Sequence, residues 1–521
     1  MRNSASRLEL VAVAASLALG AVVWEAAGHL TSGAFWAPLS TTLASLGSLA
    51  ASGALARYAA NSLELYATGL ALGIVVGAPF GLLLARLPWL RVALEDYVMM
   101  LYATPMVALI PFILSMLGFG FTPKVLVVFL FAVFPVLYNT VEGARSIRPE
   151  LVEVAHSFRS SEWQLWRDVM IPYTLPFAMT GVRQAIARGL VGMVAAEFFL
   201  SPSGLGQMIM LGSQNFDTAS MLAAILVIVV LGVALMDLGR YIERRFAAWR
   251  GGRRVSDVRA IAAMGVRRAP TARPLPPLVL KLAAGIVLLA LWEALVRAFA
   301  PAYVARPTGV ARVLLKVLAD AQFRAAAAAT LWAVAQGLGV SLVAGTAIGF
   351  LMGRVALVER GLRYYVFSLF ATPMVAILPL VTLWFGYNAD ARLAVVVFAS
   401  FFSIAINAAD GARSVPLEYL EVARSFRARP LATLRDVVFP SSLPYLFAGV
   451  RLAAGRALVG AVVAEFFISI PGLGYYILFN SRTFKHNEAF VAVIVLVAAG
   501  VGFEVLVRRL AQRYLPWARR A

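Results

Sequence analysis

Cysteine is absent from this 521-residue sequence, and only three histidines are present, His29, His156 and His486. Without a thiol the chain can form neither a disulfide framework nor a thiolate metal site. Cysteine content therefore does not indicate whether the protein lies in an oxidising or a reducing compartment. The histidines are far apart in the sequence, and no group of nucleophilic or metal-binding residues accompanies them. We therefore expect no metal site and no catalytic residue on this chain.

A phosphate-binding loop is also missing. The sequence has no G-x-x-x-x-G-K-[ST] motif, so the chain is not expected to hydrolyse ATP itself. Charged residues make up only 14% of the chain, whereas 61% of it is hydrophobic, and the mean hydropathy is +0.83. A soluble protein of this length does not bury so much apolar surface in its core. The composition therefore predicts an integral membrane protein.

Long apolar runs of about 20 residues have the length of a transmembrane helix. The predicted spans are 8–27, 64–86, 94–117, 124–142, 177–199, 219–239, 277–298, 330–353, 362–385, 391–409, 445–468 and 488–507. The first follows a leader, Met1 to Arg7, that resembles the charged region of a signal peptide. We expect this helix to be retained, because Trp24-Glu25 near its end has a counterpart in Trp292-Glu293.

The net charge of +20 reflects arginines at the ends of apolar runs. This pattern indicates a positive-inside bias and not a nucleic-acid partner. Residues 240–273 contain ten arginines against two acidic residues, which places this region in the cytoplasm, beside the anionic lipid of the inner leaflet.

An internal repeat organises the chain. Ala103-Thr104-Pro105-Met106 recurs as Ala371-Thr372-Pro373-Met374, and Gly143-Ala144-Arg145-Ser146 recurs as Gly411-Ala412-Arg413-Ser414, with a constant offset of 268 positions. The repeat indicates duplication and fusion. We predict two units, 1–246 and 276–521, joined by a linker, 247–275. If both units have the same orientation, each needs an even number of spans, and six in each leaves a pathway between the halves.

A polar segment between the fourth and fifth spans stands out in both units. It covers Glu153 to Pro176 and recurs from Glu421 to Pro444. Its first part contains no glycine or proline until Pro172, which predicts one or two short amphipathic helices that Pro172 and Pro176 then end. A solvated interfacial loop is the alternative for one copy, whereas two copies in register favour a binding surface.

These residues resemble the EAA motif of importer-type ATP-binding-cassette permeases, E-A-A-x3-G-x9-I-x-L-P. Glu153-Val154-Ala155 matches its start and Val169-Met170-Ile171-Pro172 its end, and the second copy does so again. The segments Gly449 to Leu452 and Gly472 to Gly474 are most similar to the nitrate, taurine and alkanesulfonate branch. The motif glycine is replaced by arginine in both copies. Because arginine disfavours a positive φ, we expect a different bend between the two short helices.

The resemblance implies an all-α polytopic protein of two tandem six-helix type I importer units in parallel. It also implies two cytoplasmic ATPase subunits that carry ATP and Mg, an extracytoplasmic solute-binding protein, and a bacterial inner membrane with both termini in the cytoplasm. No cofactor is implied for this chain. The candidate ATPase-coupling residues are Glu153, Ala155, Phe158, Arg159, Pro172, Glu421, Ala423, Phe426, Arg427 and Pro440.

Prolines in the third span of each half suggest where a pathway runs. Proline removes a backbone donor, and carbonyls freed at membrane depth must face protein or water. Thr104-Pro105 with Pro111, and Thr372-Pro373 with Pro379, are expected to break the span twice, so nearby residues would be accessible to thiol reagents once replaced by cysteine. A packed kink is the alternative. The pathway candidates are Thr104, Pro105, Met106, Asn139, Arg188, Thr372, Pro373, Met374, Asn407 and Arg456.

Charged residues in the fifth spans leave alternatives open. Arg188 and Arg456 either present cations to an anionic substrate or brace the two halves. Glu197 and Glu465 are expected to contact the Gly-Leu-Gly loop that follows each of them.

Two outer loops differ in charge, which suggests that they dock different parts of a binding protein. The candidate docking residues are Asn215, Asp217, Arg482 and Lys485. Neutral drift of exposed loops is the alternative explanation of the charge difference. The sequence thus predicts a fused permease of an importer for a small solute, for example an anion such as a sulfonate, nitrate or carboxylate. A secondary transporter with two parallel six-helix repeats is the alternative.

Overall fold

The computed structural model describes residues 2–33, 35–200, 202–246 and 276–515, and every regular element in these ranges is a helix. In the first half the elements are α1 (Arg2–Leu30), α2 (Leu39–Ala51), α3 (Ala54–Arg86), α4 (Pro88–Ala103), η1 (Met106–Leu109), α5 (Ile110–Leu117), α6 (Phe121–Arg145), α7 (Pro149–Ser157), α8 (Glu162–Gln164), η2 (Leu165–Met170), α9 (Ile171–Phe199), α10 (Gly204–Gln214) and α11 (Thr218–Phe246).

In the second half they are α13 (Pro277–Phe299), α14 (Pro307–Ala319), α15 (Ala321–Arg354), α16 (Ala356–Ala371), η3 (Met374–Ile377), α17 (Leu378–Phe385), α18 (Ala389–Arg413), α19 (Leu417–Ser425), α20 (Pro430–Thr433), η4 (Leu434–Val438), α21 (Phe439–Ile468), α22 (Leu473–Arg482) and α23 (His486–Tyr514). The predicted linker, 247–275, lies outside the described residues.

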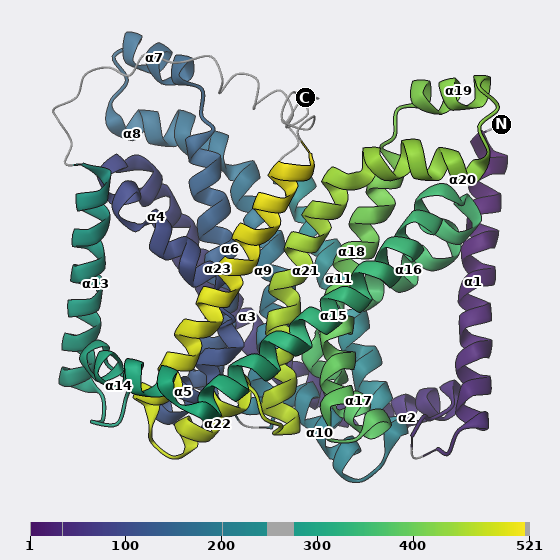
Figure 1. Ribbon diagram of the computed structural model, residues 1–521, viewed down its shortest axis with the longest axis horizontal. Coiled ribbons are helices and arrows are strands. Elements are labelled where there is room, and N and C mark those ends of the chain that lie inside the picture. The colour runs from purple at the N-terminus through teal and green to yellow at the C-terminus, as the bar shows by residue number, and fades with distance from the viewer. Residues whose placement is uncertain (1, 34, 201, 247–275, 516–521) are drawn as a thin grey trace.

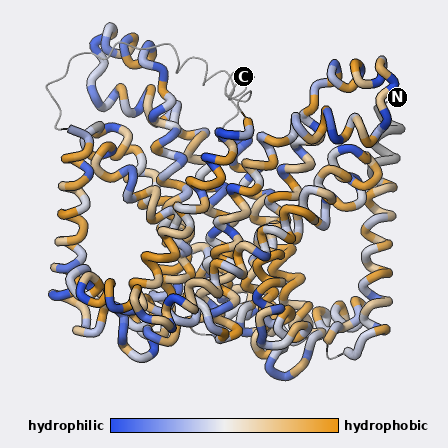
Figure 2. The backbone as a smooth tube through the Cα atoms, viewed as in Figure 1, coloured by the Kyte–Doolittle hydropathy of each residue, from blue (hydrophilic) through white to orange (hydrophobic). Residues whose placement is uncertain are grey.

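The predicted membrane spans are present as helices. Among the residues that the structure describes, nine helices are long and apolar enough to cross a membrane, and the number is twelve when each of three bent helix pairs is taken as one span. Figure 2 shows hydrophobic residues through the middle of the bundle and hydrophilic residues gathered toward its two ends. The all-α membrane fold with two like halves is therefore confirmed.

The two ends of the bundle carry different elements (Figure 1). α1 begins and α23 ends on the side where α7 and α19 lie, and α2, α10, α14 and α22 lie on the opposite side. α2 and α14 were not predicted from the sequence. Each is only 13 residues long, too short to span a bilayer, so the search for long apolar runs did not detect them.

Close packing within each half depends on small residues. In α3, glycines recur every four residues at positions 69, 73, 77 and 81, along the face that packs against α6. A Cβ atom added at Gly77 would lie 2.8 Å from the carbonyl oxygen of Val133, so only glycine permits this approach. α15 packs against α18 in the same way. Small residues at helix interfaces are typical of membrane proteins, in which close backbone contact replaces the hydrophobic effect.

The first helix of each half packs against the other half. α1 contacts α16, and α13 contacts α4, at opposite edges of the molecule (Figure 1). The Tyr365 hydroxyl donates to the Ser16 carbonyl at 2.7 Å, and the equivalent Tyr97 hydroxyl donates to the Lys281 carbonyl at 2.8 Å. The two predicted units are therefore not self-contained bodies, because each gives its first helix to the other.

The third span of each half is bent at the predicted place. The axis turns by 89° between α4 and the η1–α5 segment, and by 97° between α16 and the η3–α17 segment. The second break expected at Pro111 and Pro379 is absent. Each of these prolines lies in the first turn of the following helix, where no intrahelical N–H bond is needed, so it begins a helix and does not interrupt one.

Candidate functional site

The polar segment of each half forms a helical hairpin outside the apolar core (Figure 1). In the first half Ala155 is buried with Leu165 and Met170, whereas Glu153 on the same helix is exposed. Phe158 at the hairpin tip is 81% exposed, and its counterpart Phe426 is 82% exposed. Covering a large aromatic side chain that is exposed to water is energetically favourable. These hairpin tips therefore have the composition of a docking surface.

In the second copy Glu421 is likewise exposed and Ala423 is buried. Both hairpins also carry an adjacent ion pair after the tip, in which Arg167 donates to Asp168 at 2.7 Å and Arg435 to Asp436 at 2.8 Å. The hydrogen bond from Arg167 lowers the pKa of the Asp168 carboxyl. The two hairpins thus present similar surfaces on the same side of the molecule.

The arginines that replace the motif glycine adopt the glycine conformation. Arg159 has φ 55° and Arg427 has φ 51°. Around Arg159, the N–H of Ser160 donates to the Ala155 carbonyl and the N–H of Arg159 to the His156 carbonyl, which is the Schellman pattern of helix termination. The expectation of a different bend was wrong. Two backbone hydrogen bonds and the following helix hold the left-handed turn, and they outweigh the strain of the arginine Cβ.

The expectation that Pro172 and Pro176 end the polar segment was also wrong. From Glu162 to Phe199 the chain runs through α8, the π-helical turn η2 and α9 with no interruption, and Pro172 lies in the first turn of α9. In a π turn each N–H donates to the carbonyl five residues earlier, so the hydrogen-bond ladder is already displaced where Pro172, which has no N–H, begins the next helix. The second half repeats this arrangement at η4 and Pro440. Each hairpin is therefore joined rigidly to a membrane helix.

Glu197 at the outer end of α9 is fully buried and anchors the loop that follows it. Its carboxylate accepts a hydrogen bond from the Ser62 hydroxyl at 2.6 Å and another from the Gly206 N–H at 2.8 Å. A Cβ atom at Gly204 would lie 2.2 Å from the Glu197 carboxylate, so this glycine makes room for the side chain. The expected contact with the Gly-Leu-Gly loop is confirmed.

The second half builds the same anchor with one addition. Glu465 accepts from the Thr330 hydroxyl and from the Gly474 N–H, both at 2.8 Å. It also forms an ion pair with Arg392 at 3.2 Å. Thr330 and Arg392 were not predicted as partners of this glutamate. The 268-residue register pairs them with Ser62 and Lys124, and this pairing of polar residues within apolar runs was the available signal.

Half of the predicted pathway residues are buried in a packed core that joins the two halves, namely Pro105, Met106, Thr372, Pro373 and Met374. Met106 is 9% exposed and Met374 is 7% exposed, and Ala108 and Ala376 are not exposed at all. η1 contacts α21, and η3 contacts α9, so the bent spans of one half cover the fifth span of the other. The bent segments therefore close the interface at this level.

The polar groups beside the bends are satisfied within their own helices. The hydroxyls of Thr104 and Thr372 each donate at 2.8 Å to a carbonyl one turn earlier. Asn139 and Asn407 donate to the carbonyls of Pro135 and Ser403 at 2.8 and 2.7 Å. Pro105 and Pro373 are buried at the bends themselves.

Arg188 and Arg456 are placed differently from the other pathway candidates. The Arg188 guanidinium lies over the Tyr102 ring, 4.3 Å from its centroid, and that of Arg456 lies over the Phe370 ring at 4.2 Å. Tyr102 and Phe370 are equivalent residues just before the two bends. The structure thus brings together an arginine of the fifth span and an aromatic residue of the bent span in each half.

The two outer loops have the same backbone and different charges. Phe216 and Phe484 both adopt a positive φ, 57° and 59°. Asn215 and Asp217 in one loop, and Arg482 and Lys485 in the other, are exposed on the side away from the hairpins. Arg482 also borders a cavity between the halves that is lined by residues of α5 and α22, with Phe199 and Phe466 beside them.

The fold and these paired features define a multi-span helical membrane protein with two like halves. The family model for the binding-protein-dependent transport system inner membrane component matches the chain twice, over residues 70–248 and 341–519. The chain therefore belongs to this family, and it contains two of the family's domains.

Curated relatives match one half at a time. The riboflavin transport system permease protein of Chloroflexus aurantiacus is 36% identical over 165 residues, 32% of this chain and 62% of the relative. The formylaminopyrimidine transport permease protein of Halalkalibacterium halodurans is 28% identical over 236 residues, 45% of this chain and 94% of the relative. The putative aliphatic sulfonates transport permease protein of Bacillus subtilis is 30% identical over 181 residues, 35% of this chain and 64% of the relative. Relatives named for taurine, bicarbonate and nitrate transport match as well. The match to the Halalkalibacterium halodurans protein covers almost all of that relative but less than half of this chain. This agrees with a fusion of two permease domains.

Proposed function

We propose that this chain is the transmembrane permease subunit of an ATP-binding-cassette importer, with two permease units fused in one polypeptide. The observation that carries the proposal is the pair of hairpins, α7–α8 and α19–α20, which lie on one side and expose Phe158 and Phe426. Two copies of an ATPase subunit would each receive one hairpin. ATP and Mg would bind to those subunits, and no cofactor is assigned to this chain.

The hairpin side is the cytoplasmic side in this proposal. The arginine-rich region 240–273 supports it, because positive charge is retained in the cytoplasm. The termini and the hairpins then face the ATPase, and the loops at residues 215–217 and 482–485 face a solute-binding protein outside a bacterial inner membrane. Membrane lipid surrounds the helices, and no nucleic acid takes part.

The transported solute is proposed to be small. The relatives' names include sulfonate, taurine, nitrate and bicarbonate, which are charged, and riboflavin and formylaminopyrimidine, which are heterocyclic. Family membership by itself does not choose between these classes, so the choice depends on the residues inside the pathway.

The proposal is tested by purifying the tagged full chain from its own cell membranes in mild detergent. We expect an ATPase subunit to copurify at two copies per chain, and solute uptake into vesicles to require ATP hydrolysis. Glu153→Lys combined with Glu421→Lys should lower the ATPase ratio and leave membrane insertion unchanged. Asp390→Lys is the control and should keep the ratio, because this exposed acidic residue lies in the first turn of α18, and the hairpin follows the last turn of that helix.

A secondary transporter would give different results. Its uptake would follow an ion gradient in vesicles without ATP, and no ATPase would copurify with the wild-type chain. An undiminished ATPase ratio with normal transport in the double glutamate variant would remove the proposed role of the hairpins.

A further inference from the structure

Two arginines lie near the middle of membrane helices without an acidic partner. Arg188 lies in α9 and Arg456 at the equivalent place in α21. Among the described residues, neither guanidinium group makes an ion pair or a hydrogen bond, and each contacts only the face of an aromatic ring. A charge at this depth is costly, so it faces the protein interior or water and generally has a function.

The neighbouring arginines on the same helices, in contrast, each have a carboxylate partner from this chain. Arg183, five residues nearer the hairpin, pairs with Glu243 at 3.1 Å, and its counterpart Arg451 pairs with Glu504. The buried carboxylates further along the same helices, Glu197 and Glu465, are held by their own hydrogen-bond networks. The deeper arginine pair has therefore been left without an anion from the protein.

Stacking on the aromatic rings leaves the guanidinium N–H groups available. A guanidinium that lies over a ring uses its face for the contact, while its donors point outward in its own plane. These donors match two oxygens of a carboxylate, sulfonate or similar anion. Tyr102 and Phe370 thus hold the two side chains in place without consuming their hydrogen-bonding capacity.

The two arginines lie on fifth spans that both border the interface between the halves. The fifth span of each half contacts the bent span of the other, and the positive charges of Arg188 and Arg456 interact with each other. Arg188 is exposed and Arg456 is partly exposed, whereas the residues of η1 and η3 are largely buried. Two like charges that repel each other beside a closed core form a site for a ligand of opposite charge.

We propose that Arg188 and Arg456 together form an anion-binding site in the translocation pathway, with one arginine from each half. This inference rests on the proposed transport function and names its substrate class as a small anion with two or more oxygen atoms. The anion would bridge the two halves and relieve their repulsion, so its arrival and departure would be linked to the approach and separation of the fifth spans.

The test uses the full chain in lipid nanodiscs and measures the thermal unfolding midpoint with sodium nitrate, bicarbonate, acetate and methanesulfonate, each against sodium chloride at equal ionic strength. At least one of these anions should raise Tm by on the order of 1 °C at ten times its dissociation constant. Arg188→Gln with Arg456→Gln should abolish the rise. The matched control, Arg183→Gln with Arg451→Gln, removes the paired arginines and should keep it.

Thermal unfolding without the added anions distinguishes an anion-binding role of the two arginines from a role in holding the two halves together. Removing two repelling charges should leave Tm of the anion-free double variant equal to or above that of the wild type, whereas loss of a structural brace would lower it. The proposal is overturned if no tested anion stabilises the wild type more than chloride does, if the double variant keeps the rise, or if it melts lower without anions. ATPase copurification with the same variants is measured separately. If the wild-type chain copurifies with its ATPase but no anion raises its Tm, the anion site is refuted and the proposed transport function is not.

Discussion

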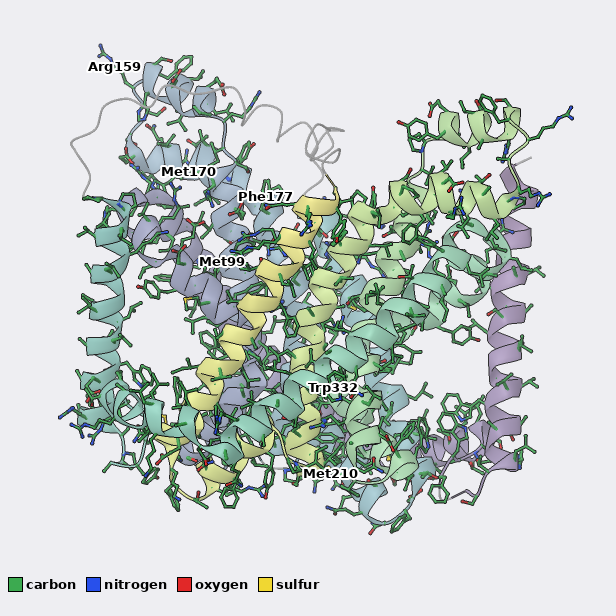
Figure 3. The ribbon with its side chains drawn as sticks, viewed as in Figure 1. Met99, Arg159, Met170, Phe177, Met210 and Trp332 are labelled. Atoms are coloured by element: carbon green, nitrogen blue, oxygen red, sulfur yellow. The ribbon has the colours of Figure 1, made fainter. Side chains whose placement is uncertain are left out.

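At the scale of single residues, Arg159 and Arg427 show that a motif position can keep its backbone geometry after losing its glycine. A left-handed residue other than glycine costs roughly 1–2 kcal/mol because its Cβ approaches the next carbonyl oxygen. The same replacement stands in both hairpins, and Figure 3 shows the Arg159 side chain pointing away from the protein. Neither side chain makes an ion pair within the described residues. We infer that the arginines are kept for a contact outside this chain.

Replacing both arginines with glycine separates these two effects. Arg159→Gly with Arg427→Gly should leave Tm unchanged or raise it. The change removes backbone strain of about 1 kcal/mol per site, and the greater conformational entropy of glycine in the unfolded chain offsets part of this gain. The same variant should weaken ATPase association, which is measured as the copurifying ratio.

The corresponding double alanine variant is the control, because it removes the charge and keeps the Cβ strain. It should weaken association equally with no gain in Tm. A lower Tm in the glycine variant would mean that the arginine side chains stabilise the hairpins themselves.

At the scale of elements, the α3–α6 and α15–α18 pairs depend on close backbone approach. Gly337 and Gly339 lie two residues apart in α15 and differ completely in their surroundings. A Cβ at Gly337 would lie 2.3 Å from the Val396 side chain, whereas a Cβ at Gly339 would meet nothing within 4 Å. The second position is therefore a matched control for the first.

Gly337→Leu should lower the stability of the protein by about 1–3 kcal/mol, because the added side chain overpacks the interface with α18. Gly339→Leu should have little effect, and the measurement is Tm in the same detergent. Equal destabilisation by the two changes would show that leucine acts through the local helix and not through packing between helices.

The bent third spans are also a property of elements, and their burial changes what cysteine scanning should find. Accessible pathway residues were predicted near Met106 and Met374, and both of these side chains are at least nine-tenths buried in the structure. Single cysteines at positions 106, 108, 374 and 376 should therefore be protected in the absence of nucleotide, and under the proposed function a transport state that opens the interface between the halves should make them reactive.

Phe158→Cys at an exposed hairpin tip is the control that should react in every state unless the ATPase covers it. Because the native chain has no cysteine, each reaction reports one position. Full reactivity of all four buried positions without nucleotide would contradict the closed packing between the halves.

At the scale of the whole molecule, the two halves are alike in backbone and unlike in charge at the outer end. One outer loop carries Asp217, and the other carries Arg482 and Lys485. Opposite charges on neighbouring surfaces steer encounter and fix the orientation of a partner, and salt screens the effect. The fused chain can therefore offer different surfaces to the two lobes of one binding protein.

Arg482→Glu with Lys485→Glu should slow association of the solute-loaded binding protein at low ionic strength, with a smaller effect at high salt. The association rate on nanodisc-embedded transporter is the measurement. Arg324→Glu, an exposed cation near the start of α15 at the same end, is the control and should change the rate less. Equal rates for the double variant and the wild type at low salt would leave the loop charges without a docking role.

Much of this arrangement was determined by the sequence alone. Apolar length defined the twelve spans, the 268-residue offset defined two like units, and Thr104-Pro105 and Thr372-Pro373 marked the bends, because each of these depends on local chemistry or on periodicity along the chain. The contact between each buried glutamate and the loop that follows it was also predictable, since the partners are close in sequence.

Other features were decided only by the tertiary structure. The exchange of α1 and α13 between the halves, the burial of Met106 and Met374, and the meeting of Arg188 with Arg456 depend on which helices become neighbours. Both halves have almost the same pattern of spans, so a helix can pack within its own unit or across to the other with similar local preferences. Only the packing of side chains over the whole bundle distinguishes these choices, and it is this packing that leaves Arg188 and Arg456 without an acidic partner among the described residues.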